Sequence, residues 1–472
     1  MKRQLENSMT QQTGILLKNC FCVWQGAGQN PLKGYDILIQ NEQIKKIEQD
    51  IDMAETHGFR RIDCSDHVVL PGFVNTHHHF YQTLTRNIPA VQNAKLFDWL
   101  VYLYEIWKYV DEDAIFCSSL LAMGELLKTG CTLSTDHHYL YPKDINCDIM
   151  ATQFKAAETL GMRFSPARGA MSLSKKDGGL PPDTVVQTED EILKDCERVI
   201  NEFHDDSKFS MRKIVLAPCS PFSVTRELMK DTARLARKYG VRIHTHLAET
   251  ADEDDYCKQI YGKRPLALMA ECDFLGEDVS YIHGIFFNDD EIEFLSQTKT
   301  QIVHCPTSNM RLGSGICRVV EMSPKGINIG LGVDGSASND SSDMLAEIRN
   351  ALLLQRVHYG ASAIDKTQVL KMATENGAEL LNFDHVGQIK EGFAADIAVF
   401  NVKKMEYAGA LSDPVAALIF SGYNHATEYT IVNGEVVVDK GNLAGFDEEK
   451  LFERANEISH NMIRRHDKND SR

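Results

Sequence analysis

Length, composition and charge exclude several classes of protein for this chain. It has 472 residues, of which 43% are hydrophobic and 25% charged, as in a folded globular protein rather than a disordered or fibrous one. A chain this long exceeds one ordinary core, so we expect a large domain of roughly 250–350 residues and a smaller unit. The net charge of −17 repels phosphate backbones and disfavours nucleic-acid polymers as partners.

The sequence also indicates where the protein works. The start, MKRQLENSMTQQTG, lacks the apolar run of a secretory signal, and no stretch approaches the ~18 apolar residues of a membrane span. The 12 cysteines are scattered and form no CxxC pair, which is typical of reduced core residues in a cytosolic protein. We therefore expect a cytoplasmic protein with no membrane partner.

In chain order, the first predicted elements are short strands. Residues 15–47 alternate apolar and polar side chains around a turn rich in Gly, Asn and Pro. The same alternation returns at 396–402 and 428–443, where the Asn433-Gly434 pair predicts a β-hairpin. Two β-rich ends around a different middle predict a small β-sandwich domain built from both termini.

The middle of the chain, from about residue 68 to 382, has another pattern. Eight short, β-branched apolar runs alternate with helical patterns, which is the signature of an α/β fold of the (β/α)₈ TIM-barrel type. The clearest predicted helices cover 114–130, 190–203, 226–240 and 344–355. Gly130 and Gly240 follow two of them, where a left-handed cap is expected.

These elements predict a nested division of the chain. Residues 1–68 form the N-terminal part of the β-sandwich domain, and 69–388 form the barrel. Residues 389–472 return to the β-sandwich domain and end in a C-terminal helix. The long polar loop 174–187, after the third barrel strand, is a candidate active-site lid.

Residues able to bind a metal cluster at the carboxyl ends of the predicted strands, where barrels keep their active sites. In the first strand, VNTHHHFYQ, alternation puts His77 and His79 on one face and His78 on the other. Other barrel strands end in further candidates: His246 with Glu249 on the fifth, His283 on the sixth and Asp334 on the eighth. The combination of histidines and a carboxylate predicts a metal site.

The motifs around these residues resemble the amidohydrolase superfamily over essentially the whole chain. They are PGFVNTHHH (71–79), HTHLAET (244–250) and VDGSASND (333–340). Longer segments, such as HCPTSNMRLGSGICR (304–318), resemble its 8-oxoguanine deaminase group, whose relatives include isocytosine, guanine and triazine aminohydrolases.

The resemblance implies one divalent metal. Nitrogen ligands with one carboxylate suit Zn²⁺, with Fe²⁺ as the alternative. Binuclear relatives use a carboxylated lysine on strand four, and the corresponding run IVLAPCS (214–220) contains none. The implied ligands are His77, His79, His246 and Asp334.

The resemblance also implies hydrolytic deamination of an amino-substituted aromatic heterocycle, with 8-oxoguanine giving urate and ammonia. Glu249 would carry a proton from water to a ring nitrogen, and Asp334 would pass the second proton to the departing amine. His283 would orient the attacking hydroxide. The alternatives are an isocytosine, guanine or triazine aminohydrolase of the same branch and, more remotely, a non-catalytic oligomeric barrel scaffold.

The expected partner is a small heterocyclic base, and barrels of this type commonly form homo-oligomers. Gln82 resembles the glutamine that reads the carbonyl and ring-nitrogen edge of such substrates. Tyr139 would contact the ring or pack in the core, and Arg168 would meet a substrate oxygen or pair with a carboxylate.

The remaining polar and aromatic candidates are predicted to support the site rather than act in it. We expect His304 to hold a metal ligand through a hydrogen bond. The others are expected to be structural: His137 and His138, Trp99 in the core, and Ser336 and Asn339 in the loop after Asp334.

Overall fold

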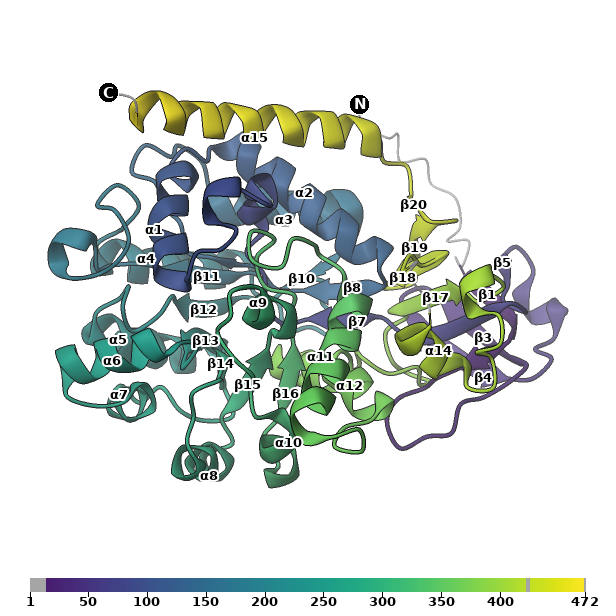
Figure 1. Ribbon diagram of the computed structural model, residues 1–472. Helices are drawn as coiled ribbons and strands as arrows, with labels where there is room; N and C mark the ends of the chain where they lie inside the picture. The colour runs from purple at the N-terminus through teal and green to yellow at the C-terminus, as the bar shows by residue number, and fades with distance from the viewer. Residues whose placement is uncertain (1–13, 422–424, 471–472) are drawn as a thin grey trace.

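Figure 1 shows a large α/β body with a smaller β-rich part at one side, where strands from both chain ends meet. The computed structural model describes residues 14–421 and 425–470. The interpretation of the first 13 residues therefore lies outside the described residues.

The strands of the large body run parallel and follow one another in chain order. One sheet contains β7 (Phe73–Asn75), β8 (Cys131–Ser134) and β10 (Arg163–Phe164). The other contains β9 (His137–His138), β11 (Ala167–Ala170), β12 (Val215–Pro218), β13 (Arg242–Leu247), β14 (Val279–His283), β15 (Gln301–His304) and β16 (Ile329–Leu331).

Hydrogen bonds link the last strand to the first. The Thr76 backbone N–H donates to the Leu331 carbonyl at 3.0 Å, and the Asp334 N–H donates to the His77 carbonyl at 3.1 Å. The parallel sheet therefore curls as in a TIM-like barrel, which confirms that part of the fold prediction. This curl brings the carboxyl ends of distant strands together.

Helices lie between and around the strands. Their bounds are α1 Leu96–Trp107, α2 Glu112–Lys128, α3 Ile149–Leu160, α4 Glu189–Phe203, α5 Arg226–Tyr239, α6 Ala251–Tyr261, α7 Pro265–Glu271, α8 Asp289–Thr298, α9 Pro306–Arg311, α10 Val319–Met322, α11 Met344–Tyr359, α12 Lys366–Met372, α13 Glu375–Leu380, α14 Pro414–Phe420 and α15 Glu448–Asp470. All four clearly predicted helices are present, and α5 ends at Gly240 with φ +70°, a left-handed cap.

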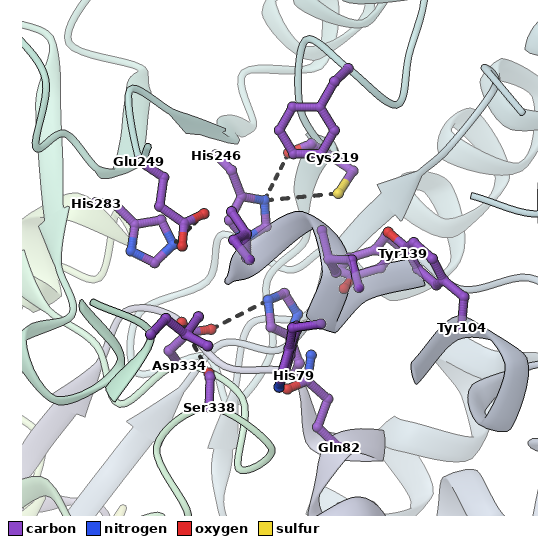
Figure 2. A pocket seen from close by; sticks show the side chains of 15 residues that line it. His79, Gln82, Tyr104, Tyr139, Cys219, His246, Glu249, His283, Asp334 and Ser338 are labelled. Carbon is purple, nitrogen blue, oxygen red and sulfur yellow. Dashed lines mark hydrogen bonds and ion pairs between the residues drawn. The ribbon is translucent and has the colours of Figure 1, made fainter. Parts of the chain in front are cut away.

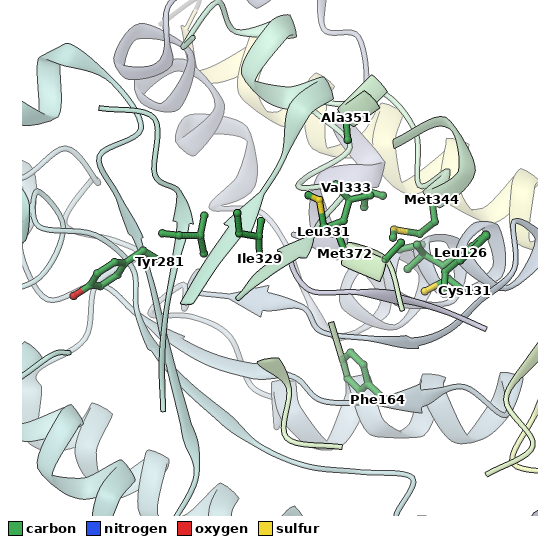
Figure 3. Close-up of a cluster of buried hydrophobic side chains, with 14 of the residues drawn as sticks. Leu126, Cys131, Phe164, Tyr281, Ile329, Leu331, Val333, Met344, Ala351 and Met372 are labelled. Carbon is green, nitrogen blue, oxygen red and sulfur yellow. The ribbon is translucent and has the colours of Figure 1, made fainter. Parts of the chain in front are cut away.

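Apolar side chains hold the helices against the barrel. Figure 3 shows part of this core, where Ile329 and Leu331 of β16 lie in one cluster with Met344 of α11 and Met372 of α12. All 12 cysteines are free of disulfides, and all but Cys147 are buried. None of the described helices is long and apolar enough to cross a membrane.

Two sheets form the smaller part. One has the order β4-β3-β1-β5, built from β1 (Gly14–Cys20), β3 (Tyr35–Gln40), β4 (Gln43–Glu48) and β5 (Arg60–Asp63). The other has the order β2-β6-β17-β18-β19-β20, built from β2 (Cys22–Val23), β6 (His67–Pro71), β17 (Ile397–Asn401), β18 (Tyr429–Val432), β19 (Glu435–Asp439) and β20 (Asn442–Leu443). The second sheet thus joins strands from both ends of the chain.

Side chains of both sheets enter one apolar cluster, which includes Ile37 from the first and Ile397 from the second. The predicted hairpin is confirmed, because Val432 pairs with Glu435 across Asn433-Gly434. The domain boundaries stay a prediction, and the one placed at residue 68 falls inside β6. Helix α15 lies across the barrel helices α1 and α2 (Figure 1).

A buried ion pair joins the barrel to the β-rich part. The Nε and Nη2 groups of Arg163 each donate to one carboxylate oxygen of Asp396 at 2.9 Å, and neither side chain is more than 1% exposed. Replacing Arg163 by methionine would leave the Asp396 carboxylate buried without its cation. We expect the free energy of unfolding to fall by about 3–5 kcal/mol, measured as a lower melting temperature.

Arg234 offers a matched control, because its side chain is 78% exposed and pairs with Asp231 on the surface of α5. Arg234→Met is expected to cost less than about 1 kcal/mol. Equal melting temperatures for the two variants would contradict the structural role given to Arg163.

Candidate active site

Three imidazoles meet at the carboxyl ends of the barrel strands. His77 and His79 follow β7, His246 lies in β13, and one ring nitrogen of each falls within 4.8 Å of the others. Asp334 joins them, with its Oδ1 3.3 Å from His77 Nε2 and 3.4 Å from His79 Nε2. His78 points elsewhere, toward Ser342 Oγ at 3.0 Å, as strand alternation predicts. The structure thus brings the four predicted ligands together.

Hydrogen bonds orient these imidazoles. His79 Nδ1 lies 2.8 Å from the His137 carbonyl, and His246 Nδ1 lies 2.8 Å from the Cys219 carbonyl. Since a carbonyl can only accept, both Nδ1 atoms carry the proton and both Nε2 atoms keep a free lone pair. His77 Nδ1 lies 3.0 Å from His244 Nε2, and His244 Nδ1 lies 2.9 Å from Ser280 Oγ.

The cluster fits a divalent cation. His77 Nε2 is buried and has no hydrogen-bond partner among the described residues, which is costly unless another group binds it. Burial holds the pKa of His77, His79 and His246 below the usual histidine range, so all three are neutral as ligands must be. Three imidazoles and one carboxylate are a donor set that suits Zn²⁺ or Fe²⁺.

Asp334 stays ionised despite its burial. Burial raises the pKa of its carboxyl, but the attraction of His77, whose Nε2 lies 3.3 Å from Oδ1, and of the neighbouring imidazoles outweighs it, so the pKa lies well below its usual range. The backbone is left-handed here, with φ +65°, and the Gly335 N–H donates to Oδ1 at 2.6 Å. A strained, tightly held residue of this kind is common at functional sites.

A second carboxyl faces the cluster. The Glu249 side chain is buried, and its Oε2 lies 3.5 Å from His283 Nε2. Burial, together with the charges of Asp334 and Glu253, raises the pKa of Glu249 well above its usual value. His283 Nδ1 lies 2.9 Å from Asn309 Oδ1, which turns Nε2 toward Glu249. Figure 2 shows Glu249 and His283 side by side above Asp334.

These groups line one pocket with apolar and aromatic walls. Helix α1 contributes Leu96, Trp99, Leu100 and Tyr104, and other walls come from Cys219, Phe222 and Leu312. None of the described lining residues is a lysine or arginine. The pocket therefore suits an uncharged planar molecule better than a phosphorylated one.

Comparison with known proteins agrees with this geometry. Residues 68–437, most of the chain, match the Amidohydrolase family. The chain belongs to the amidohydrolase family.

Several characterised amidohydrolases are similar to this one. It is 45% identical to 8-oxoguanine deaminase of Pseudomonas aeruginosa, over 84% of this chain and 87% of the relative. It is 35% identical to hydroxydechloroatrazine ethylaminohydrolase of a Pseudomonas species, over 92% of each chain. A crystal structure of atrazine chlorohydrolase from Arthrobacter aurescens, complexed with zinc, matches with a TM-score of 0.88 at 28% identity, over 94% of this chain and 100% of that one. This amidohydrolase is a hydrolytic deaminase acting on carbon–nitrogen bonds.

Two of the predicted substrate contacts line the pocket of this amidohydrolase. Gln82 lies in the short 3₁₀ helix Phe80–Thr85 after His79, and its Oε1 is buried without a hydrogen-bond partner among the described residues. Tyr139 follows β9 and packs edge-on against His79, with ring centroids 5.0 Å apart. Trp99, predicted as a core residue, is buried in a core cluster and also lines the pocket.

Arg168 corrects one prediction, because it lies outside the pocket. Its Nε donates to Asp195 at 2.8 Å and its Nη2 donates to the Gln187 side chain at 2.9 Å. The guanidinium also lies 4.0 Å from the centroid of the Tyr141 ring. Arg168 was expected either to meet a substrate oxygen or to pair with a carboxylate. The structure favours the carboxylate, since Nε, Nη1 and Nη2 all donate to protein acceptors.

His304 also differs from expectation, and the 174–187 loop does not line the pocket. Both ring nitrogens of His304 are buried without a hydrogen-bond partner among the described residues, so it does not hold a metal ligand as predicted. None of the pocket-lining residues comes from the loop 174–187, whereas four come from α1, so the lid stays a prediction.

The other supporting residues lie as predicted. His137 bonds the Ala217 carbonyl through Nε2 at 3.0 Å and stacks on His246, while His138 Nε2 bonds the Leu140 carbonyl at 2.8 Å. His77, His137 and His244 form a second group of close nitrogens, but hydrogen bonds already occupy the facing atoms of His77 and His244. Ser336 and Asn339 bond within and around the loop after Asp334.

The sequence interpretation missed several pocket and supporting residues. His244 was open to prediction, because it shares a strand face with His246, two residues on, just as His77 does with His79. Ser338, Tyr104, Cys219 and Asn309 carry no such spacing signal. Tertiary packing alone brings them to the site.

Proposed function

We propose that the protein catalyses metal-dependent hydrolytic deamination of an amino-substituted aromatic heterocycle, converting 8-oxoguanine to urate and ammonia. The observation that carries the proposal is the buried Glu249 carboxyl, 3.5 Å from His283 Nε2 beside the histidine cluster. Similarity to an 8-oxoguanine deaminase supports the choice of substrate. The aromatic pocket, whose described lining includes no lysine or arginine, supports a free base rather than a nucleic-acid polymer.

We propose one metal ion, held by His77, His79, His246 and Asp334, with Zn²⁺ favoured over Fe²⁺. When bound, such an ion lowers the pKa of water to about 7 and so supplies a nucleophile at neutral pH. Metal analysis of the purified protein tests this part, with close to one zinc per chain expected. A metal-free active enzyme would contradict it.

The protein residues would move two protons. As the water oxygen bonds to the ring carbon that carries the amino group, Glu249 takes one water proton and gives it to the adjacent ring nitrogen. Asp334 takes the second proton and passes it to the amino group. The carbon–nitrogen bond then breaks, ammonia leaves, and the carbon keeps the oxygen as a carbonyl.

The environment of each group suits its part in these transfers. The raised pKa of Glu249, caused first by burial, allows the carboxyl to hold the proton between transfers. Asp334 stays ionised and can accept a proton, and Ser338 Oγ lies 3.5 Å from its Oδ2. His283, held by Asn309 and lying beside Glu249, would orient the attacking oxygen.

Ammonia release from a panel of free bases tests the substrate. We expect the highest kcat/KM with 8-oxoguanine and lower values with guanine, isocytosine and hydroxylated amino-triazines. A higher value with one of the others would reassign the substrate within the branch. No activity on any of these bases would reopen the substrate class. A cytoplasmic homo-oligomer stays the prediction made from the sequence.

Gln82 gives a test of substrate recognition. Its Oε1 is buried in the pocket without a partner among the described residues, so we propose that a substrate N–H satisfies it. Gln82→Ala is expected to raise KM roughly 10–100-fold with a smaller effect on kcat, because a hydrogen bond in a buried site is lost. Gln259→Ala, at an exposed position of α6, is the control. An unchanged KM in Gln82→Ala would remove this residue from substrate binding.

A further inference from the structure

The turn that carries Glu249 has an unfavourable backbone conformation. Ala248, between β13 and Glu249, has φ +56°, in the left-handed region that residues with a Cβ atom rarely adopt. The direction of the Glu249 side chain depends on this turn, since Ala248 is its immediate neighbour. Something in the fold must therefore hold the turn.

A second glutamate, four residues after Glu249, holds it. Glu253 lies in the first turn of α6 with only 1% of its surface exposed. Its Oε1 accepts a hydrogen bond from the Ala248 N–H at 2.9 Å, and its Oε2 accepts one from the Glu249 N–H at 3.1 Å. No salt bridge joins Glu253 to a basic side chain among the described residues. Both oxygens of this buried carboxyl serve the backbone of the turn.

The other side of the turn is tied to the strand that carries His283. The Ala248 carbonyl accepts hydrogen bonds from the N–H groups of Ile285 and Phe286 at 2.8 and 2.9 Å. The Gly284 N–H donates to the Leu247 carbonyl at 3.2 Å. The turn is thus held from α6 on one side and from the end of β14 on the other, and these contacts set Glu249 against His283.

We propose that Glu253 is a positioning residue that fixes the left-handed turn at Ala248 and thereby aims the Glu249 carboxyl at the substrate. The effect on turnover rests on the role proposed above for Glu249. The effect on the turn itself does not.

The chemistry requires a carboxylate rather than an amide at this position. Two backbone N–H groups converge on Glu253, and each needs an acceptor. Glutamine offers one acceptor oxygen and an NH₂ group, which would face an N–H and leave it without a partner. Aspartate keeps both oxygens but is one methylene shorter.

Glu253→Gln tests the proposal in the metal-loaded full-length enzyme. We expect kcat to fall about 10–100-fold because a small displacement of a proton-transfer group slows the reaction. KM and metal content should stay within twofold of wild type. Asp252→Asn is the matched control, since it removes the same charge from an exposed position in the same helical turn. It should leave all three quantities unchanged.

A double variant separates positioning from a general structural role. If Glu253 acts only through Glu249, adding Glu253→Gln to Glu249→Gln should lower kcat by less than about threefold more. If kcat of the double variant instead falls by the product of the two single-variant losses, the proposal is overturned. Loss of metal from Glu253→Gln would overturn it too, since that would show a collapse of the whole site.

Hydrogen exchange gives a readout that needs no substrate. In Glu253→Gln the amides of Ala248 and Glu249 should exchange at least tenfold faster, while those of β13 stay protected. If wild type deaminates no base but these amides are freed, the proposed function fails and the positioning of the turn stands. If Glu253→Gln changes neither the exchange rates of these two amides nor kcat, the inference is overturned. Should Glu253→Gln not fold, Glu253→Asp is measured by the same readouts.

Discussion

Replacing Glu249 by glutamine is expected to lower kcat roughly 10²–10⁴-fold while the metal stays bound, as loss of a general acid–base group does. The side chain keeps its size, and Glu249 is not among the four groups that surround the cation site. What disappears is the exchangeable proton of a carboxyl whose pKa burial raises well above its usual value. Steady-state kinetics on the best base, with metal analysis of the same sample, make the measurement.

Glu158 provides the matched control for this substitution. It is an exposed residue of α3 outside the pocket, so Glu158→Gln makes the same chemical change without touching the site. The control should keep wild-type kcat. A metal-loaded Glu249→Gln enzyme with near-wild-type kcat would remove Glu249 from proton transfer, and the mechanism proposed here would fail with it.

Removal of one imidazole ligand has the second large expected effect. His246→Ala should lose the bound metal and with it nearly all activity, because His246 Nε2 faces the cluster while Nδ1 is engaged by the Cys219 carbonyl. Stability reports the loss independently. A ligand present at 100 to 1,000 times its Kd stabilises the folded state by about 2.7–4.1 kcal/mol.

In wild type, a chelator should therefore lower the melting temperature, and added zinc should restore it. In His246→Ala the chelator should have little further effect. His358→Ala, at an exposed position of α11, is the control and should behave as wild type does. A His246→Ala protein that keeps one metal per chain and responds to the chelator as wild type does would disprove the assigned ligand set.

Local sequence patterns could predict the ligand cluster, because two short-range rules determine it. Strand alternation places His77 and His79 on one face, and parallel strands bring their carboxyl ends to one rim of the barrel. Glu249 and His283 follow from the same rules. The barrel and the β-hairpin at Asn433-Gly434 were predictable for related reasons. The spacing of apolar residues and the residue types at a turn both depend only on neighbouring positions in the sequence.

The walls of the pocket and the partners of buried groups were not predictable in this way. Arg168 lies within β11 rather than at its end, and its side chain turns to Asp195 of α4, so only the packing of that helix decides between substrate contact and carboxylate pairing. The loop 174–187 was the candidate for a pocket wall, but the lining residues come from α1 instead. Glu253 stands among the exposed acids of α6, and only the fold shows that it is buried.

We propose above that a metal-dependent site in this pocket deaminates a free purine base. Incubation of the purified enzyme with 8-oxoguanine, following ammonia and urate together, tests it most directly. The enzyme is expected to form equal amounts of the two products, to lose both after treatment with a chelator, and to recover when zinc is added back. Absence of both products from a zinc-loaded, folded enzyme would contradict the proposed substrate, and turnover that persists without metal would contradict the proposed site.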